Sequence, residues 1–216
     1  MKTRSFLAAV LAAVTFVSCS DRKVYLFNGE NLDGWKTVLR DDPDAITGPS
    51  TFSAKDGVIY ITGTPFGYIR TEKVFSNYKL HLEWRWAGEE SADGGVFHFL
   101  QGADKVWPQG IQFQMTSKDM GFLMGGIPIE GVEGPSFYRK ARLVEESPEK
   151  PLGEWNDLDF ECKEGVVKAW LNGVLVNEAK CQASEGYIGI QSEGGPIEFR
   201  NIYLTKARYT NPSLSY

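Results

Sequence analysis

Short apolar segments separated by tight-turn dipeptides are the feature that most constrains the fold of this chain. The turn signals recur at short intervals, at Asn28-Gly29, Asp33-Gly34, Asp56-Gly57, Asp93-Gly94-Gly95, Glu164-Gly165, Asn172-Gly173 and Gly194-Gly195. Regular short strands joined by such turns are typical of β-sandwiches and barrels. No internal repeat or linker interrupts residues 24–206. We therefore predict one all-β domain, a sandwich of two antiparallel sheets.

Two segments alternate apolar and polar residues with period two, as half-buried strands do. Lys79–Trp86 places two leucines and two tryptophans on one face, and His81, Glu83 and Arg85 on the other. Residues 110–115 likewise place Gln112 and Gln114 opposite three apolar side chains. We expect the polar faces of these strands to lie together.

The clearest hairpins lie late in the chain, where Leu158–Lys163, Val166–Leu171 and Val174–Ala179 are joined by Glu164-Gly165 and Asn172-Gly173. Both residues of an Asn-Gly pair tolerate positive φ, so an antiparallel meander is predicted. Phe137–Glu146 is the one segment with a helix-like pattern. A loose tail is expected from about Ala207.

The first residues have the pattern of a targeting segment. Lys2 and Arg4 precede the apolar run Phe6–Val17, which is too short to span a bilayer and indicates a signal peptide. Phe16-Val17-Ser18-Cys19 resembles a lipobox, so we expect lipid on Cys19; a plain secretory signal cut near Ser18 is the alternative. The predicted layout is signal 1–19, tether 20–23, domain 24–206 and tail 207–216. The protein is expected to be exported and lipid-anchored to the outer membrane, facing the periplasm or the cell surface.

Charge and cysteine content exclude some functions. The formal net charge is −5, and loss of the leader removes only positive charges. An acidic domain without a basic stripe argues against a nucleic-acid partner. Cys162 and Cys181 either form a disulfide, which export permits, or remain separate buried thiols. Their spacing does not fit a structural zinc site.

Several motifs in one order resemble the 3-keto-disaccharide hydrolase family, which is common among Bacteroidetes lipoproteins. They are Leu26 to Trp35, Asp93 to Phe97, Gly110 to Gln114, Gly153 to Asn156, Leu171 to Gly173, Gly186 to Gln191 and Phe199 to Ile202. The resemblance covers Val24 to Lys206. It implies a concanavalin A-like jelly roll of two curved antiparallel sheets, and glycosides oxidised at C3 as the substrate class. The chain departs from the family pattern at Asp93, Gly94, Phe99 and Gln112.

A C3 ketone makes the C2 proton of a sugar acidic, so a base can start an elimination that expels the glycosidic oxygen from C1. This route needs a positioned base, donors around the enolate oxygen and a proton source for the leaving group. We predict catalytic roles for Glu83, His98 and Gln114. Glu83 is the base, with His81 as the alternative base; His98 titrates near neutrality, and Gln114 is a donor.

Substrate binding is predicted for residues that can donate to hydroxyls or stack on a sugar ring, namely His81, Arg85, Gln112, Gln191, Trp107 and Trp155. Each has a structural alternative. Glu83 and Arg85 also fit a solvated surface, His98 fits a hydrogen-bonded core position, and the tryptophans fit core or rim packing.

Asp157, Asp159 and Glu161 alternate along one strand face. Three such carboxylates fit a solvated outer face, a Ca²⁺ site built from hard oxygen ligands, or paired-carboxylate catalysis. No cofactor is assigned with certainty, and Ca²⁺ or another divalent metal is the candidate.

Two functional classes therefore remain open from the sequence: an enzyme that cleaves 3-keto-glycosides, and a noncatalytic carbohydrate-binding module of the cell surface. A structural partner in a surface assembly, with a large apolar patch, is a third reading. Oligomeric state is left open.

Overall fold

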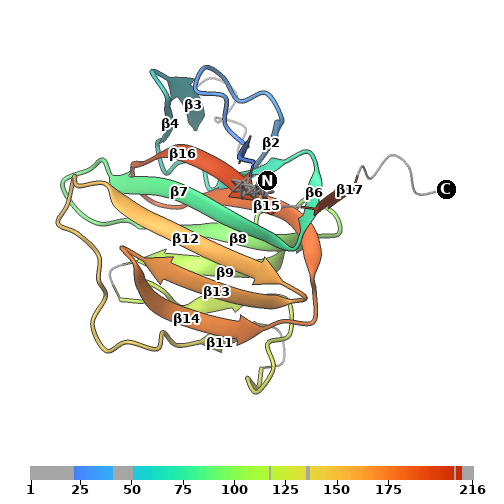
Figure 1. Ribbon diagram of the computed structural model, residues 1–216. Helices are drawn as coiled ribbons and strands as arrows, with labels where there is room; N and C mark the ends of the chain where they lie inside the picture. Colours follow the sequence, from blue (N-terminus) through green and yellow to red (C-terminus); the bar gives the residue numbers. More distant parts are fainter. Residues whose placement is uncertain (1–21, 41–50, 117, 135–136, 207, 211–216) are drawn as a thin grey trace, which may run out of the picture.

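In the computed structural model, two antiparallel sheets pack face to face around one core (Figure 1). The structure describes residues 22–40, 51–116, 118–134 and 137–206, and the backbone of 208–210. The predicted lipidation residue, Cys19, lies outside these residues. Among the residues described, no helix is long and apolar enough to cross a membrane.

One sheet has eight strands in the order β14-β13-β12-β7-β16-β4-β3, with β1 beside β16. Its strands are β1 (Val24–Tyr25), β3 (Phe52–Lys55), β4 (Val58–Ile61), β7 (Tyr78–Trp86), β12 (Asn156–Lys163), β13 (Val166–Leu171), β14 (Val174–Lys180) and β16 (Ile197–Thr205). This is the sheet nearest the viewer in Figure 1.

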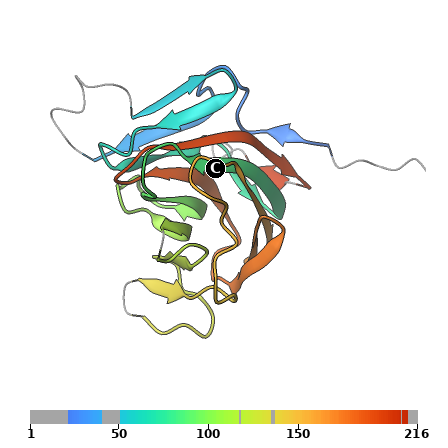
Figure 2. The same ribbon diagram turned by 90° about the vertical axis from the view of Figure 1, so that its left-hand side faces the viewer.

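The other sheet has nine strands in the order β11-β10-β9-β8-β15-β5-β2, with β6 beside β15 and β17 beside β6. Its strands are β2 (Trp35–Leu39), β5 (Gly67–Thr71), β6 (Val74–Ser76), β8 (Asp93–Gln101), β9 (Gln109–Thr116), β10 (Leu123–Gly125), β11 (Tyr138–Lys140), β15 (Glu185–Ser192) and β17 (Arg208–Thr210). Figure 2 shows the two layers from the side, with green β8 and β9 opposite orange β12 to β14. The predicted jelly roll is confirmed.

The core lies between the two sheets and consists of the apolar side chains on the inward faces of the alternating strands. Trp84 and Trp86 of β7 are 0% and 1% exposed, and Ile111 and Phe113 of β9 are both 0% exposed. Period two thus assigned the inward residues of these strands correctly. Burial of this kind stabilises a fold by about 25 cal/mol per Å² of apolar surface.

The predicted hairpins form at the turn dipeptides. Glu164 and Asn172 have φ of 51° and 49°, and the glycine after each has φ near 80°. Two consecutive positive φ values match the twist of the strands that the turn joins. Lys163 therefore pairs with Val166, and Leu171 with Val174, in the expected antiparallel meander.

Three expectations at other places need correction. Phe137–Glu146 contains the short strand β11 and irregular backbone instead of a helix, because Tyr138–Lys140 pairs with β10. Part of the expected loose tail, Arg208–Thr210, pairs with β6. Cys162 and Cys181 are free buried thiols, so the disulfide alternative is wrong.

Candidate functional site

The predicted polar residues divide between the two outer faces of the sandwich. Glu83 and its neighbours His81 and Arg85 lie on β7 of the eight-stranded sheet, whereas Gln112 and Gln191 lie on β9 and β15 of the nine-stranded sheet. The two groups are therefore separated by the core. The expectation that they share one face is wrong, and the face with the glutamines must be considered by itself.

Three buried glutamines form a hydrogen-bonded chain on the nine-stranded sheet. Gln112 Nε2 donates to Gln114 Oε1 at 2.5 Å and to Gln191 Oε1 at 2.7 Å. All three side chains are at most 7% exposed. A buried amide needs its hydrogen bonds satisfied, so this network holds each amide in one orientation.

Gly95 of β8 makes the chain of amides sterically feasible. It lies on the strand between β9 and β15, directly opposite Gln114. A Cβ at this position would lie 2.5 Å from Gln112 Nε2. The side chain of Gln112 therefore crosses over the backbone at Gly95 to reach Gln191, and a Cβ at this position would force it to shift.

A carboxyl group lies at each end of the amide chain. Gln114 Nε2 donates to Asp93 Oδ1, and Gln191 Nε2 donates to Glu193 Oε2, both at 2.7 Å. Asp93 and Glu193 also face each other across an antiparallel bridge. Opposed residues of this kind have Cβ atoms roughly 5 Å apart, so the two carboxyls can act on one bound molecule.

Both carboxyls have raised pKa values. Burial raises the pKa of Asp93 to about 6, against hydrogen bonds from Gly94 and Gln114 that lower it. Burial and the charge of Asp93 raise the pKa of Glu193 to about 7. Near neutral pH one carboxyl can thus be ionised while the other keeps its proton, as acid–base catalysis requires.

A pocket of about 210 Å³ opens over these groups. Asp93, Glu193, Gln112 and Gln114 line it on the polar side, while its apolar walls are Phe97, Trp107, Pro108, Met124 and Phe137. Trp107 is 54% exposed and Phe137 is 50% exposed. Exposed rings beside convergent polar groups are typical of a sugar-binding site. Of the residues predicted for the site, Trp107, Gln112 and Gln114 line this pocket, and Gln191 is joined to them by its hydrogen bond from Gln112.

His98 is a core residue. It lies on the inner face of β8, 0% exposed, with Nδ1 2.9 Å from the Tyr78 hydroxyl and 3.5 Å from Cys162 Sγ. Burial lowers its pKa to about 3, so the ring stays neutral. Its position excludes contact with a ligand in the pocket and corrects its predicted place in the site. Phe99, another departure from the family pattern, is also buried in the core.

Glu83 is ion-paired on the opposite face. Its carboxylate accepts hydrogen bonds from Asn201 and, at 2.7 Å, from Arg200 Nε. Although burial works to raise its pKa, these hydrogen bonds and the Arg200 charge lower it below the ordinary value. A carboxylate held ionised by a guanidinium is a weak general base.

The other predicted residues of the eight-stranded sheet are also paired with neighbours. His81 Nδ1 lies 2.8 Å from Asp159 Oδ1, and Arg85 Nε donates to Glu198 at 2.7 Å. The ring of Trp155 packs under Arg85 and Arg200, with 3.9 Å from the Arg200 guanidinium carbon to the ring centroid. Trp155 is thus separated from the glutamine pocket by the core.

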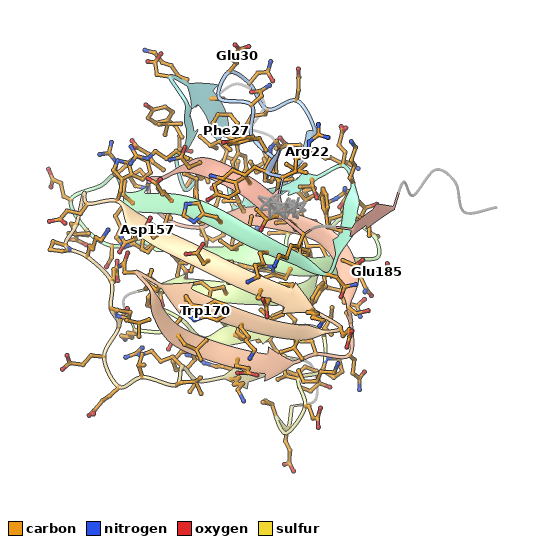
Figure 3. The ribbon with its side chains drawn as sticks, in the orientation of Figure 1. Arg22, Phe27, Glu30, Asp157, Trp170 and Glu185 are labelled. Carbon is orange, nitrogen blue, oxygen red and sulfur yellow. The ribbon has the colours of Figure 1, made fainter. Side chains whose placement is uncertain are left out.

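One group on this outer face has the ligand types for a divalent cation. His81, Glu83 and Asp157 offer atoms within 4.8 Å of one another. Figure 3 shows Asp157 on this face, which also carries Trp170. Arg200 pairs with Glu83, and Lys150 Nζ lies 3.4 Å from Asp157. A cation bound at this place would compete with Arg200 for Glu83 and with Lys150 for Asp157.

Sequence reasoning missed the two carboxyls of the site. The sequence predicts a turn at Asp93 and marks it as a departure from the family motif, whereas Asp93 begins β8; no motif points to Glu193. The sequence signal that could have found them is their position. Each carboxyl lies directly before a Gly-Gly pair, at the end of a strand that carries a residue of the site. Their proximity depends on the bridge between β8 and the end of β15.

Comparisons with known proteins agree with this fold. The family model of the 3-keto-alpha-glucoside-1,2-lyase-like domain matches residues 22–205. The 3-keto-disaccharide hydrolase of Bacteroides thetaiotaomicron is 22% identical, over 93% of this chain and 83% of that protein.

Two solved structures share the architecture. A "putative glycosyl hydrolase" from Parabacteroides distasonis superposes with a TM-score of 0.61 at 21% identity, covering 85% of this chain and 93% of that chain. A β-glucanase from Bacillus licheniformis gives 0.58 at 13% identity, covering 88% and 99%.

Two packed antiparallel sheets in this order define a concanavalin A-like jelly roll, and an acidic, amide-lined pocket opens on one of its outer faces. Because the family model spans nearly the whole described chain, the protein belongs to the 3-keto-alpha-glucoside-1,2-lyase-like domain family.

Proposed function

We propose that this protein is an enzyme that cleaves 3-keto-glycosides, and that its active site is the pocket on the nine-stranded sheet. The observation that carries the proposal is the pair of carboxyls, Asp93 and Glu193, with pKa values raised to about 6 and about 7 at the two ends of one amide chain. Family membership and the 3-keto-disaccharide hydrolase relative support the substrate class.

In the proposed reaction Asp93 acts as the base and Glu193 as the acid. Asp93 takes the proton from C2, and the electron pair of that bond forms the enolate of the C3 ketone. The enolate then expels the glycosidic oxygen from C1, and Glu193 gives this oxygen a proton. The products are an unsaturated keto-sugar and an alcohol; addition of water to the double bond completes a net hydrolysis.

The outer glutamines hold the two acids, and Gln114, which lines the pocket, also faces the bound sugar. Gln114 and Gln191 each use one amide hydrogen on a carboxyl, and an amide has two. Gln114 lines the pocket, so its second amide hydrogen can donate to the enolate oxygen or to a hydroxyl. Donors fixed before the reaction stabilise developing charge without reorganisation, which lowers the barrier. Trp107 supplies a ring face for the sugar.

A direct test uses nitrophenyl 3-keto-glucosides of both anomers and their unoxidised parents. Release of nitrophenol is expected from a 3-keto-glucoside and not from its unoxidised parent. Asp93→Asn and Glu193→Gln should each lower kcat/KM by about 10²–10⁴-fold, the usual contribution of a positioned acid or base. Glu83→Gln is the matched control on the other sheet, and we expect it to change kcat/KM by less than about threefold.

Other outcomes would redirect the assignment. Release from the unoxidised parents as well would indicate an ordinary glycosidase. A large loss in Glu83→Gln with unchanged rates in the pocket variants would move the site to the eight-stranded sheet. Saturable sugar binding without turnover would favour the noncatalytic carbohydrate-binding module.

The location and cofactor are also proposals. We propose that the protein is exported and anchored to the outer membrane by lipid on Cys19, on the basis of its leader sequence. If a divalent metal such as Ca²⁺ binds, His81, Glu83 and Asp157 are the candidate ligands. Including an EDTA arm in the turnover assay separates a metal-dependent reaction from the carboxyl mechanism.

A further inference from the structure

A row of aromatic and charged side chains crosses the outer face of the eight-stranded sheet, on the far side of the core from the proposed active site. Trp170 of β13 is paired with Asp159 of β12, which in turn is paired with His81 of β7. His81 is also paired with Tyr203 of β16, and Tyr25 of β1 continues the row. Neighbouring strands lie about 4.8 Å apart, so the three steps from Trp170 to Tyr203 span roughly 14 Å.

A hollow of about 440 Å³ opens over this row. Four members of the row line it, namely Trp170, Asp159, His81 and Tyr203. Figure 3 shows Trp170 on this face. Small-molecule sites usually occupy roughly 300–1,000 Å³, so the hollow is large enough to hold a ligand. Because the core separates it from the glutamine pocket, it is a site of its own.

Two ion pairs in the hollow present a donor beside an acceptor. His81 Nδ1 lies 2.8 Å from Asp159 Oδ1, and Lys79 Nζ lies 3.0 Å from Glu161 Oε2. The side chains of Asp159 and Lys79 are 47% and 49% exposed, so a ligand can reach both. A carboxylate retains free lone pairs after one hydrogen bond, and an ammonium retains free N–H groups. Adjacent sugar hydroxyls, which both donate and accept, fit such pairs, and the pairing of opposite charges favours a neutral ligand.

Aromatic rings lie at both ends of these polar groups. Trp170 is half-buried and lines the hollow, so its ring is held by the sheet while part of it faces a ligand. At the other end the ring of Tyr203 packs on His81, with 4.9 Å between the ring centroids, and Lys23 Nζ lies 3.8 Å from the Tyr203 centroid. This packing orders the imidazole before a ligand arrives, which lowers the cost of binding.

We propose that this row is a second carbohydrate site, which holds an intact neutral glycan chain across the strands and does not cleave it. The ring of Trp170 stacks on one sugar unit, and the two ion pairs bind hydroxyls of the units that follow toward Tyr203. The row is longer than one pyranose ring, so it selects a chain over a monosaccharide. A sugar ketone is not required, so the inference does not depend on the proposed function.

Calorimetric titration with cellohexaose, laminarihexaose, maltohexaose and mannohexaose tests the site, with glucose as the short control. At least one hexasaccharide should bind saturably, and glucose more weakly. Trp170→Ala should weaken that binding about tenfold, since a stacked ring is lost, and should leave turnover of a nitrophenyl 3-keto-glucoside unchanged. Trp107→Ala is the matched tryptophan variant on the nine-stranded sheet, and we expect it to leave the hexasaccharide affinity unchanged.

Asp159→Asn is a second variant, which keeps the shape of the side chain and removes its charge. It should weaken hexasaccharide binding several-fold, because hydrogen bonds to a charged group are stronger than those to a neutral one. Asp56→Asn, an exposed control, should not. Binding that is lost in Trp107→Ala and kept in Trp170→Ala would place the glycan in the glutamine pocket and overturn the second site. Absence of binding to all four hexasaccharides would also overturn it, whatever the turnover assay shows.

Discussion

At the scale of single residues, the absence of a neighbouring cation distinguishes Asp93 and Glu193 from Glu83 and Asp104. Guanidinium groups lower the pKa of Glu83 and Asp104. Within the described residues no ion pair involves Asp93 or Glu193, and burial raises both pKa values. Carboxyls with raised pKa values in a pocket are candidates for acid–base chemistry, whereas paired ones more often serve structure.

These pKa values predict a narrow pH range for activity. Below about pH 6 Asp93 gains a proton and loses its function as a base, and above about pH 7 Glu193 loses the proton that the leaving group needs. The profile of kcat/KM against pH should therefore be bell-shaped with its maximum between these values. The two apparent pKa values belong to the coupled pair. A rate that keeps rising above pH 8 would contradict the assignment of Glu193 as the acid.

The same shifts predict an effect on stability. A carboxyl whose pKa is higher in the folded than in the unfolded state makes the folded form bind more protons, so the free energy of unfolding falls as pH rises through the folded-state pKa. Glu193→Gln removes one such group, so at pH 8 it should raise Tm by about 2–4 °C. This corresponds to ~1 kcal/mol in the free energy of unfolding, after allowance for the partial exposure of the side chain. At pH 5 the same variant should change Tm little. Glu154→Gln, an exposed control, should show no such difference; equal Tm shifts at both pH values would contradict the prediction.

At the scale of elements, the segment between β8 and β9 connects Asp104, which is paired with Arg70 and Lys36, to the ring of Trp107. Asp104→Asn removes the charge that holds Arg70 and Lys36, and we expect the KM of a 3-keto-glycoside to rise several-fold. The kcat should stay within about twofold because the hydrogen bonds described for Asp93 and Glu193 come from Gln114 and Gln191 and none from this segment. Steady-state kinetics with Asp56→Asn as the matched control tests this. A loss confined to kcat would mean that Asp104 does not act by positioning the loop.

The sequence predicted the inward and outward residues of strands better than the sheet to which each strand belongs. Alternation assigned the buried faces of β7 and β9 correctly. Period two defines a face only relative to its own strand, and the partner of each strand is set by pairing over long sequence distances. Glu83 and Gln114 were therefore grouped although their strands lie in different sheets. The pairing of Asp93 with Glu193 likewise joins residues a hundred positions apart.

At the scale of the whole molecule, the core isolates two thiols from solvent. Cys162 is 0% exposed and Cys181 is 4% exposed. Burial raises the pKa of Cys181 to about 12 and that of Cys162 further, so both remain protonated and unreactive. In a full chain carrying Cys19→Ala, a thiol reagent at pH 8 should label neither residue until the fold opens, and both in urea.

Adding Cys162→Ala to that chain should reduce the labelling in urea to one thiol. Rapid labelling without denaturant would contradict the buried position of these side chains. Mass spectrometry of the unlabelled chain provides a second check, since a loss of two hydrogens would reveal the disulfide that the structure lacks.

The central position of Gln112 has one more consequence for the two acids. Because Gln112 Nε2 donates in both directions, Gln114 and Gln191 must turn their oxygens inward and their nitrogens toward the carboxyls. Neither outer amide can rotate alone without placing two donors or two acceptors against each other. A protonated Glu193 still offers an acceptor oxygen to Gln191 Nε2, so the three amides keep the same direction while the carboxyls gain or lose protons. The amide chain thus keeps one N–H aimed at each carboxyl whichever of the two acids carries the proton.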